Sequence, residues 1–370
     1  MKSRNPWMLI VLLLLPLLVL RGPGDAAFAA APASAARRLE ISLAQCVEGY
    51  IAGSDAVRTA EKKAADSAEA HKRAVAEKKA ALSLAELEIA AESAQLALAE
   101  ARNNAALLAV QAYTGLVQAA RDAESKHASL AVAEEKLRVL RLRHQAGLIT
   151  SDTVLQQENA YLSAKDAVIR ADDSLRQAKD DLCRAMAVDL YEEIVLTTDV
   201  ASLVDETVTY DVAECTVLAR AASSSYFSAV KSEELAGQKY EALQDPMIAA
   251  KAERASAEEA LRDAADKLSN AEKSLNDSVA NALTQLDSLI RSLRMQVLSA
   301  QLADANLDVA RIKFGYGEML QYELDSEVNS VDQAHVRVTK AKEDLYVQVL
   351  KIESMIGRDV ADMLSQAGLK

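Results

Sequence analysis

Seven side chains in this sequence have the chemistry to bind a transition metal or to act as nucleophiles. They are His71, His127, His144, His335, Cys46, Cys183 and Cys215. Zinc sites recruit histidine and cysteine ligands a few residues apart, and none of these seven has a partner at such a spacing. The sequence also contains no glycine-rich phosphate loop and no G-x-S-x-G nucleophile motif. It therefore predicts no catalytic site, no metal and no cofactor.

The three cysteines do not form the pattern of a disulfide framework, because they are odd in number and far apart. The segment 43–46, Leu-Ala-Gln-Cys, superficially resembles a lipid-attachment site. However, Gln45 is a poor residue before a lipidated cysteine, and the site lies far beyond the apolar stretch near the N-terminus. We therefore expect Cys46 to be a small buried residue of a helix.

The N-terminus has the organisation of a cleaved secretory signal. Lys2 and Arg4 precede an apolar run of 14 residues, 7–20, and small residues follow with an Ala-Phe-Ala site at 27–29. The alternative is a membrane anchor, but a spanning helix needs about 20 apolar residues. We therefore predict a signal peptide at 1–30 and an exported chain without a transmembrane helix.

The charge balance is acidic, at −13 for the whole sequence. The predicted signal peptide carries three basic residues and one acidic residue, so its removal leaves −15. Such a balance disfavours binding to nucleic acid or to an anionic lipid surface. It does not identify a partner, because solvated acidic helix faces give the same number.

Long helices are predicted along almost the whole chain. Proline occurs only once after Pro32, at Pro246, and strong helix formers dominate the composition. The first helix begins at Ser42, which can form a capping box with Gln45. From about residue 80 the pattern stays helical to 146, and a helix of about 60 residues is about 90 Å long.

Gly147 ends this long pattern, and Ser151 or Asp152 can cap the next helix, which runs to about 187. The segment 194–210 is rich in β-branched residues and lacks a helical period, which indicates an extended connection. The second half has helices from 211 to 243, from the turn at Pro246 to 314, and from the glycines at 315 and 317 to 356. The predicted organisation is a signal peptide (1–30), a first helical-hairpin repeat (31–190), an extended linker (191–210) and a second helical-hairpin repeat (211–370).

The two halves match without gaps at an offset of 170 residues, which pairs Gly147 with Gly317 and Leu175 with Leu345. Apolar residues also recur every seven positions in both halves. Before each glycine they are Leu116, Ala123, Leu130 and Leu137, matched by Leu286, Leu293, Ala300 and Leu307; after it they are Val154, Tyr161, Val168, Leu175 and Leu182, matched by Leu324, Val331, Val338, Leu345 and Ile352. A strict seven-residue period indicates helices that supercoil along a shared seam.

The pattern therefore predicts an all-α fold of two tandem antiparallel coiled-coil hairpins, each with a glycine at its tip. Leu155, Leu162 and Ile169 add a second apolar column to one helix. A helix with two apolar columns contacts neighbours on both sides, as in a bundle or a closed helical barrel.

Four segments, taken in order, resemble the TolC-like outer-membrane efflux proteins. They are the opening segment 39–45, the first tip at 143–151 (Arg-His-Gln-Ala-Gly-Leu-Ile-Thr-Ser), the second tip at 314–317 (Phe-Gly-Tyr-Gly) and the closing helix 341–357. Each motif is short, and their order, the tandem repeat and the signal peptide together carry the resemblance. It covers essentially the whole predicted mature chain.

In that family, three subunits close into a helical tunnel, and the hairpin tips meet a periplasmic adaptor and form a gate. The resemblance therefore implies a homotrimer that works with a periplasmic adaptor (a membrane fusion protein) and an inner-membrane pump. Carried over by position, the adaptor-docking tips would consist of Gly147, Leu148, Thr150, Ser151, Gly317, Met319 and Leu320.

Three acidic residues just behind the tips, Asp152, Glu323 and Asp325, are candidates for a negative constriction that favours cations. The alternative is that these carboxylates cap helix N-termini and complement the helix dipole, and for Asp152 this explanation is at least as good. The family's gate often has a basic residue two places after the second tip glycine. Met319 stands there in this sequence, so an ionic lock at this position is not predicted.

The sequence departs from the family in one feature. Family members insert a strand pair into each half, and these strands build a β-barrel in the outer membrane. Transmembrane strands need alternating segments of about 10 residues and aromatic girdles. The segments 70–105 and 247–275 instead have a helical composition, and aromatic residues make up only 4% of the chain. The prediction is therefore a TolC-like subunit without a transmembrane β-barrel.

Two functions are compatible with these predictions. The first is transport: an oligomeric helical conduit for efflux or type I secretion, exported to the periplasm or the outer membrane. The second is a non-conducting coiled-coil scaffold or spacer of the cell envelope that keeps the same repeat. The missing strands favour the scaffold, whereas two tips in matching register favour transport. A role as the adaptor fits less well, because adaptors combine one hairpin with β-rich domains.

Overall fold

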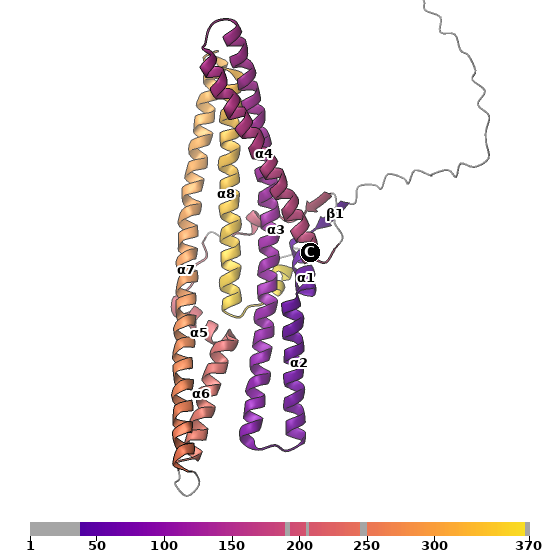
Figure 1. Cartoon of the computed structure of the whole chain (residues 1–370). Helices are drawn as coiled ribbons and strands as arrows, with labels where there is room; N and C mark the ends of the chain where they lie inside the picture. The colour runs from indigo at the N-terminus through magenta and orange to yellow at the C-terminus, as the bar shows by residue number, and fades with distance from the viewer. Residues whose placement is uncertain (1–37, 189–192, 205–206, 245–249, 367–370) are drawn as a thin grey trace, which may run out of the picture.

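The computed structural model describes residues 38–188, 193–204, 207–244 and 250–366 (Figure 1). The predicted signal peptide at 1–30 and the predicted turn at Pro246 lie outside these residues. The elements, in chain order, are β1 (Arg38–Ile41), α1 (Leu43–Gly53), α2 (Asp55–Ala76), α3 (Ala81–Gln145), α4 (Ser151–Ala185), β2 (Glu193–Leu196), the 3₁₀ helix η1 (Val200–Leu203), α5 (Val212–Ala222), α6 (Ser224–Ala242), α7 (Lys251–Gly315), α8 (Gln321–Met355) and α9 (Val360–Gln366).

Two long hairpins form the frame of the molecule, which confirms the predicted fold class. Helices α3 and α7 have 65 residues each, about 100 Å at 1.5 Å per residue, and α4 and α8 have 35 residues each. Helix α3 packs against α4, and α7 packs against α8. The first and last residues of α7 and α8 follow those of α3 and α4 at the predicted offset of 170.

The predicted apolar seam lies inside each hairpin. Most of its residues on α3 and α7 are buried, among them Leu116, Leu137, Leu286 and Leu307. Its residues on α4 and α8 are buried or half-buried. A helix of this length is stable because a continuous apolar stripe is covered by its neighbour along the hairpin.

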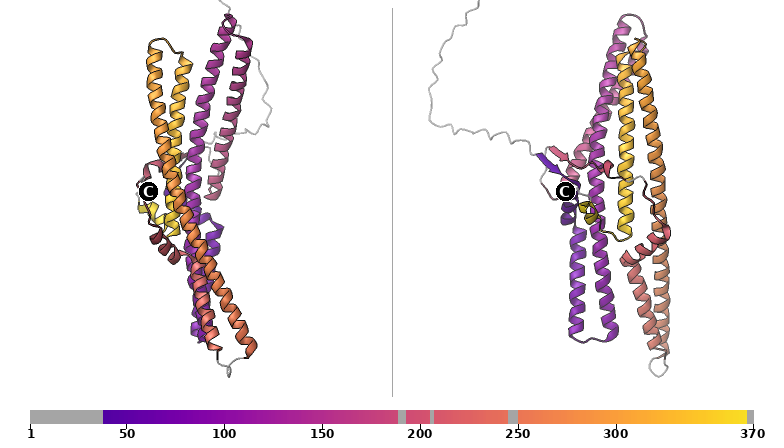
Figure 2. Two further views of the ribbon diagram at one scale, coloured as in Figure 1. Left: turned by 90° about the vertical axis from the view of Figure 1, so that its left-hand side faces the viewer. Right: turned by 180° about the vertical axis from the view of Figure 1, so that it is seen from behind.

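The helices form a wall, and the two long helices run through its whole height (Figures 1 and 2). The upper half has the order α4, α3, α8, α7, because α3 packs against α4 and α8 packs against both α7 and α3 (Figure 2, left). In the lower half, α2 packs against α3, and α6 packs against both α7 and α3. Helix α3 therefore has α4 and α8 as its neighbours in the upper half, and α2 and α6 in the lower half.

The largest apolar core lies at this change-over, at mid-height of the wall. It combines Leu43 and Val47 of α1 with residues of α3, α4, α8 and α9. Tyr113 of α3 is fully buried there; its hydroxyl donates to the Thr198 carbonyl (3.2 Å) and accepts from the Thr198 N–H (2.8 Å). This side chain holds the connection between the repeats against the first hairpin.

The structure differs from the predicted elements in four places. A parallel two-stranded sheet pairs Arg38 with Glu193 and Ile41 with Leu196, so the predicted linker contains a strand and a 3₁₀ helix. The predicted helix 211–243 is divided at Ser223, and the first helix is divided at Ser54, because each serine caps a new helix. Helix α9 was not predicted.

Of the segments 70–105 and 247–275, residues 70–76, 81–105 and 251–275 are helical as predicted, whereas a turn at 77–80, between α2 and α3, interrupts the run that the sequence predicted as continuous. Across the described ranges, no helix combines the length and the apolar character needed to cross a membrane.

Candidate functional site

The two hairpin tips lie at the same end of the molecule (Figures 1 and 2). One tip joins α3 to α4, and the other joins α7 to α8. The structure therefore brings together two segments that are 170 residues apart and that the sequence marks by Gly147 and Gly317.

The first tip is a helix C-cap closed by glycine. Gly147 has a φ of 72°, a left-handed conformation that favours glycine. The Gly147 and Leu148 N–H groups donate to the carbonyls of His144 and Arg143, both at 2.9 Å. These two bonds satisfy the last carbonyl groups of α3, and the chain then reverses into α4.

The second tip repeats this turn. Gly317 has a φ of 75°, and the Gly317 and Glu318 N–H groups donate to Phe314 and Lys313, both at 2.9 Å. A methyl group at either tip glycine would meet no atom within 4 Å, so the backbone conformation alone favours glycine. The two predicted tips thus have one geometry.

Each tip exposes a large apolar side chain at its apex. Leu148 is 72% exposed, and Tyr316, between the two glycines of the second tip, is 81% exposed. Thr150 and Ser151 are also exposed, whereas Met319 and Leu320 are half-buried. Tyr316 was not among the predicted site residues, although its place between two glycines after a long helix was a usable signal.

The three predicted acidic residues differ in their surroundings. The Glu323 carboxylate accepts from the Leu320 N–H (2.9 Å), which caps α8, and Asp325 accepts from the Gln321 side chain (2.8 Å). Asp152 is exposed in the first turn of α4, and no hydrogen bond to it is found among the described residues. Glu323 therefore caps a helix N-terminus, as the alternative explanation proposed. The role of all three carboxylates in a gate stays a prediction.

The pKa of Tyr322, at the base of the second tip, is affected by charged groups of both tips. Tyr322 of α8 is buried, and burial raises the pKa of its hydroxyl, with a further increase from the neighbouring Glu323 carboxylate. Arg143 at the end of α3 acts in the opposite direction on this pKa. The charge of Arg143 on the first tip therefore acts on the phenol of Tyr322 at the second tip.

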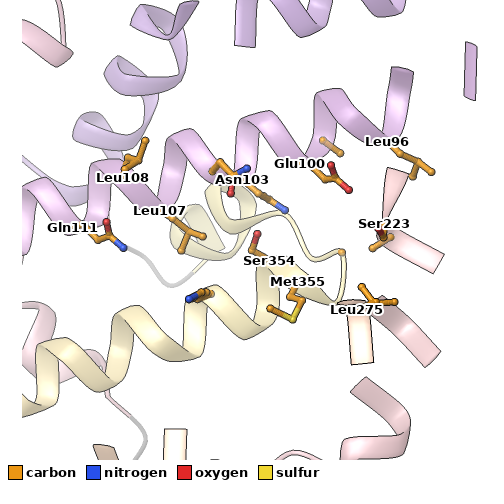
Figure 3. A pocket seen from close by; sticks show the side chains of 15 residues that line it. Leu96, Glu100, Asn103, Leu107, Leu108, Gln111, Ser223, Leu275, Ser354 and Met355 are labelled. Atoms are coloured by element: carbon orange, nitrogen blue, oxygen red, sulfur yellow. The ribbon is translucent and has the colours of Figure 1, made fainter. Parts of the chain in front are cut away.

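A cavity of about 630 Å³ lies lower down, where α8 ends and α6 begins (Figure 3). Its main polar side chains already have structural partners. The Glu100 carboxylate accepts from the N–H and the hydroxyl of Ser224, both at 2.8 Å. The Asn103 side chain donates to the Arg358 carbonyl (2.9 Å) and accepts from the Val360 N–H (3.1 Å). The cavity therefore lies where the two repeats contact each other.

The potentially reactive residues remain apart. All three cysteines are buried, and burial raises the pKa of the Cys46 thiol to about 12. His127 and His335 each contact one aspartate of their own hairpin, Asp172 and Asp304, at 3.1 and 3.2 Å. Within the described part of the chain, no group of His, Cys, Asp and Glu residues could hold a metal ion.

These features define a class of protein: a helical chain with a TolC-like fold, in which two duplicated hairpins place their tips at one end. No protein-family model and no curated protein matches the sequence.

Solved structures of outer-membrane channels share this fold. The outer-membrane channel OprN superposes with a TM-score of 0.64 at 14% identity, over 86% of this chain and 90% of its own. The outer membrane protein VceC of Vibrio cholerae gives 0.56 at 15% identity, over 86% and 96%. The CmeC outer membrane channel of Campylobacter jejuni gives 0.58 at 11% identity, over 88% of both chains. At identities this low, the similarity establishes the fold.

Proposed function

We propose that this chain is a TolC-like, extracytoplasmic component of an efflux or type I secretion system. Several copies assemble into a helical conduit in the cell envelope, and the hairpin tips of that conduit dock a periplasmic adaptor. The chain supplies a passage and a docking surface, and it catalyses no reaction.

The observation that carries this proposal is the matched pair of tips. Both use the same glycine-closed turn, both lie at one end, and each exposes a large apolar side chain, Leu148 or Tyr316. Apolar side chains that protrude from the end of a rod favour a protein partner there. A plain spacer has no need for two equivalent tips in one register.

The proposed partners follow from the shared fold. The similar structures are outer-membrane channels, and we extend from them to a homotrimer that joins a periplasmic adaptor and an inner-membrane pump. With two hairpins in each subunit, a trimer would present six tips, with Asp152 exposed beside three of them. Such a ring of carboxylates favours the passage of cations over anions.

The alternative is a non-conducting scaffold of the envelope. The helical segments 81–105 and 251–275 favour it, because the family places its membrane-crossing strands there. The two functions differ at the tips, since only the conduit requires an adaptor to bind them.

Cross-linking from the tips tests the proposal. Ser151→Cys and Leu320→Cys place thiols at the two tips, and Ser330→Cys places one on the exposed side of α8 as a control. With candidate adaptors and a short bifunctional maleimide, we expect adducts from the two tip variants and none from the control. Adducts from all three variants, or from none with any adaptor, would contradict docking at the tips.

A further inference from the structure

The turn between α2 and α3 lies at the end of the molecule opposite the hairpin tips (Figure 1). Residues 71–82 around it include four basic side chains and one acidic side chain, a net charge of +3. The basic residues are Lys72, Arg73, Lys78 and Lys79, and all four are exposed. Since the predicted mature chain carries −15, the charge at this turn is opposite in sign to that of the protein as a whole.

Two of these four charges are unpaired. Lys72 and Lys78 form no ion pair with any residue that the structure describes, and the other two basic residues each contact one exposed glutamate. Near the first tip, by contrast, Arg138 and Arg141 contact glutamates of their own hairpin at 2.6 and 2.5 Å. The ammonium groups of Lys72 and Lys78 are therefore free to bind an anionic partner.

The backbone holds Lys78 in a conformation that favours glycine. Its φ is 52°, and the N–H groups of Lys78 and Lys79 donate to the carbonyls of Val75 and Ala74 at 3.2 and 3.1 Å. The two hairpin tips make the same pair of hydrogen bonds with a glycine at this position. A lysine at positive φ is less stable there than a glycine. The turn itself therefore does not account for a lysine at position 78.

The basic turn is confined to the first repeat. At the offset of 170, residues 71–79 correspond to residues 241–249, whose sequence is Glu-Ala-Leu-Gln-Asp-Pro-Met-Ile-Ala. This counterpart contains no basic residue, although the two repeats keep the same glycine at both hairpin tips. The four charges are therefore not a general feature of the repeated hairpin.

Apolar side chains are exposed beside these charges. Val75 is 53% exposed in the last turn of α2, and Leu82 is 40% exposed in the first turn of α3. Leu82 also lines a groove of about 650 Å³ between α3, α6 and α7, together with Leu235 and Leu243. Basic residues around an exposed apolar side chain suit the surface of an anionic membrane, which offers charged headgroups next to apolar chains.

We propose that the turn between α2 and α3 binds the surface of a membrane that contains anionic lipids. Lys72 and Lys78 contact the phosphate groups of the lipids, and Val75 enters the interface between headgroups and acyl chains. Such a contact is peripheral and weakens as the salt concentration rises. It holds the end of the molecule opposite the tips against the membrane, and it depends neither on the conduit nor on the adaptor.

Sedimentation with vesicles tests the role of the charges. Vesicles of phosphatidylcholine and phosphatidylglycerol in equal parts should bind the protein, and vesicles of phosphatidylcholine alone should not. One lysine near an anionic surface contributes about fivefold in affinity, so Lys72→Gln with Lys78→Gln should weaken binding about 25-fold. Binding to both kinds of vesicle alike, or to neither, would overturn the proposal.

Lys62→Gln with Lys63→Gln is the matched control, because it makes the same change of charge at exposed positions of the same helix. Lys63 lies about 18 Å from Val75 along the helix axis, about two Debye lengths at physiological salt. The control should change binding by about twofold or less. Equal losses in the two double variants would also overturn the proposal.

Tryptophan fluorescence tests the insertion of Val75. The chain has one tryptophan, Trp7, and it lies in the predicted signal peptide. Val75→Trp therefore supplies a single probe at the turn, and Ala65→Trp supplies one at an exposed position higher on α2. Anionic vesicles should shift the emission of the first variant to shorter wavelength and leave that of the second unchanged. No shift from Val75→Trp, or equal shifts from both variants, would contradict the proposed contact.

Lys78→Gly separates membrane binding from the stability of the turn. Glycine should raise the midpoint of thermal unfolding, because it adopts a positive φ without strain. The same variant should bind anionic vesicles about fivefold more weakly, because one lysine is removed. A more stable variant that binds these vesicles as tightly as the parent protein would show that the proposal is wrong.

Discussion

Asn103 shows how a single side chain connects the two repeats. It is 6% exposed in α3, and its amide binds both the Arg358 carbonyl and the Val360 N–H beyond the end of α8. Among the described residues, no other hydrogen bond to either of these backbone groups is found, so the amide holds the closing segment of the chain against the first hairpin. A short apolar residue at this position would leave two polar backbone groups unpaired.

We therefore expect Asn103→Ala to lower the free energy of unfolding by about 2 kcal/mol. The neighbouring Asn104 is exposed, so Asn104→Ala should change it by about 0.5 kcal/mol or less. Urea unfolding followed by circular dichroism compares the two variants. Equal effects of both substitutions would argue against the joint that Asn103 is inferred to make.

Two half-buried tyrosines, Tyr50 and Tyr346, predict a loss of stability in alkali. Burial raises the pKa of Tyr50 and of Tyr346 to about 12, from 10 for an ordinary tyrosine. The unfolded chain therefore releases these protons at lower pH than the folded chain does. The stabilising contribution is complete below pH 10 and declines as the pH rises from 10 to 12.

Tyr346→Phe should make this decline shallower, because one of the ionising groups is removed. Unfolding free energies measured at intervals from pH 10 to 12 give the slope for each protein. Tyr316→Phe serves as a control on an exposed tyrosine. Identical slopes for the parent and Tyr346→Phe would show that this phenol does not contribute.

At the scale of the elements, the tip glycines and the helix glycine Gly115 make opposite predictions. Gly147→Ala and Gly317→Ala place a side chain at positive φ, so each should destabilise the fold by about 1 kcal/mol. Gly115→Ala lies inside α3 with open space around it and should stabilise by about 0.5–1 kcal/mol. Thermal unfolding of the three variants distinguishes the two cases by sign. A stabilising Gly147→Ala would be inconsistent with the turn described.

Elements with strong local signals were predictable from the sequence. The bounds of α3 and α4 differ by about two residues or fewer from the predicted ones, because glycine, capping residues and the heptad period act locally. The strands β1 and β2 were missed, since the pairing of Ile41 with Leu196 depends on residues 155 positions apart. Local signals carry no information about such a partner.

The candidate site was predictable to the same degree. The glycines marked both apices, and the offset of 170 indicated that the two tips are equivalent. The exposure of Tyr316 and the capping bond of Glu323 could not be predicted from the sequence, because both depend on the direction in which a side chain leaves the turn. The effect of Arg143 on the pKa of Tyr322 could not be predicted either, because it depends on how the two hairpins pack.

At the scale of the whole molecule, the wall of helices has two unlike flanks. Helix α4 forms one flank and helix α7 forms the other. Exposed apolar side chains line both flanks: Leu155, Leu162 and Ile169 on α4, and Met295, Leu298, Leu302 and Val309 on α7. In the proposed assembly, contacts between copies would cover both rows of apolar side chains.

The mass of the purified protein in solution tests the proposed assembly most directly. Native mass spectrometry, or light scattering during gel filtration, should give three times the mass of the mature chain. Leu162→Arg should shift the population towards the single chain, because it places a charge among the exposed apolar side chains of α4, and Ser330→Arg on the exposed side of α8 should leave it unchanged. A parent protein that remains a single chain at high concentration would contradict the account.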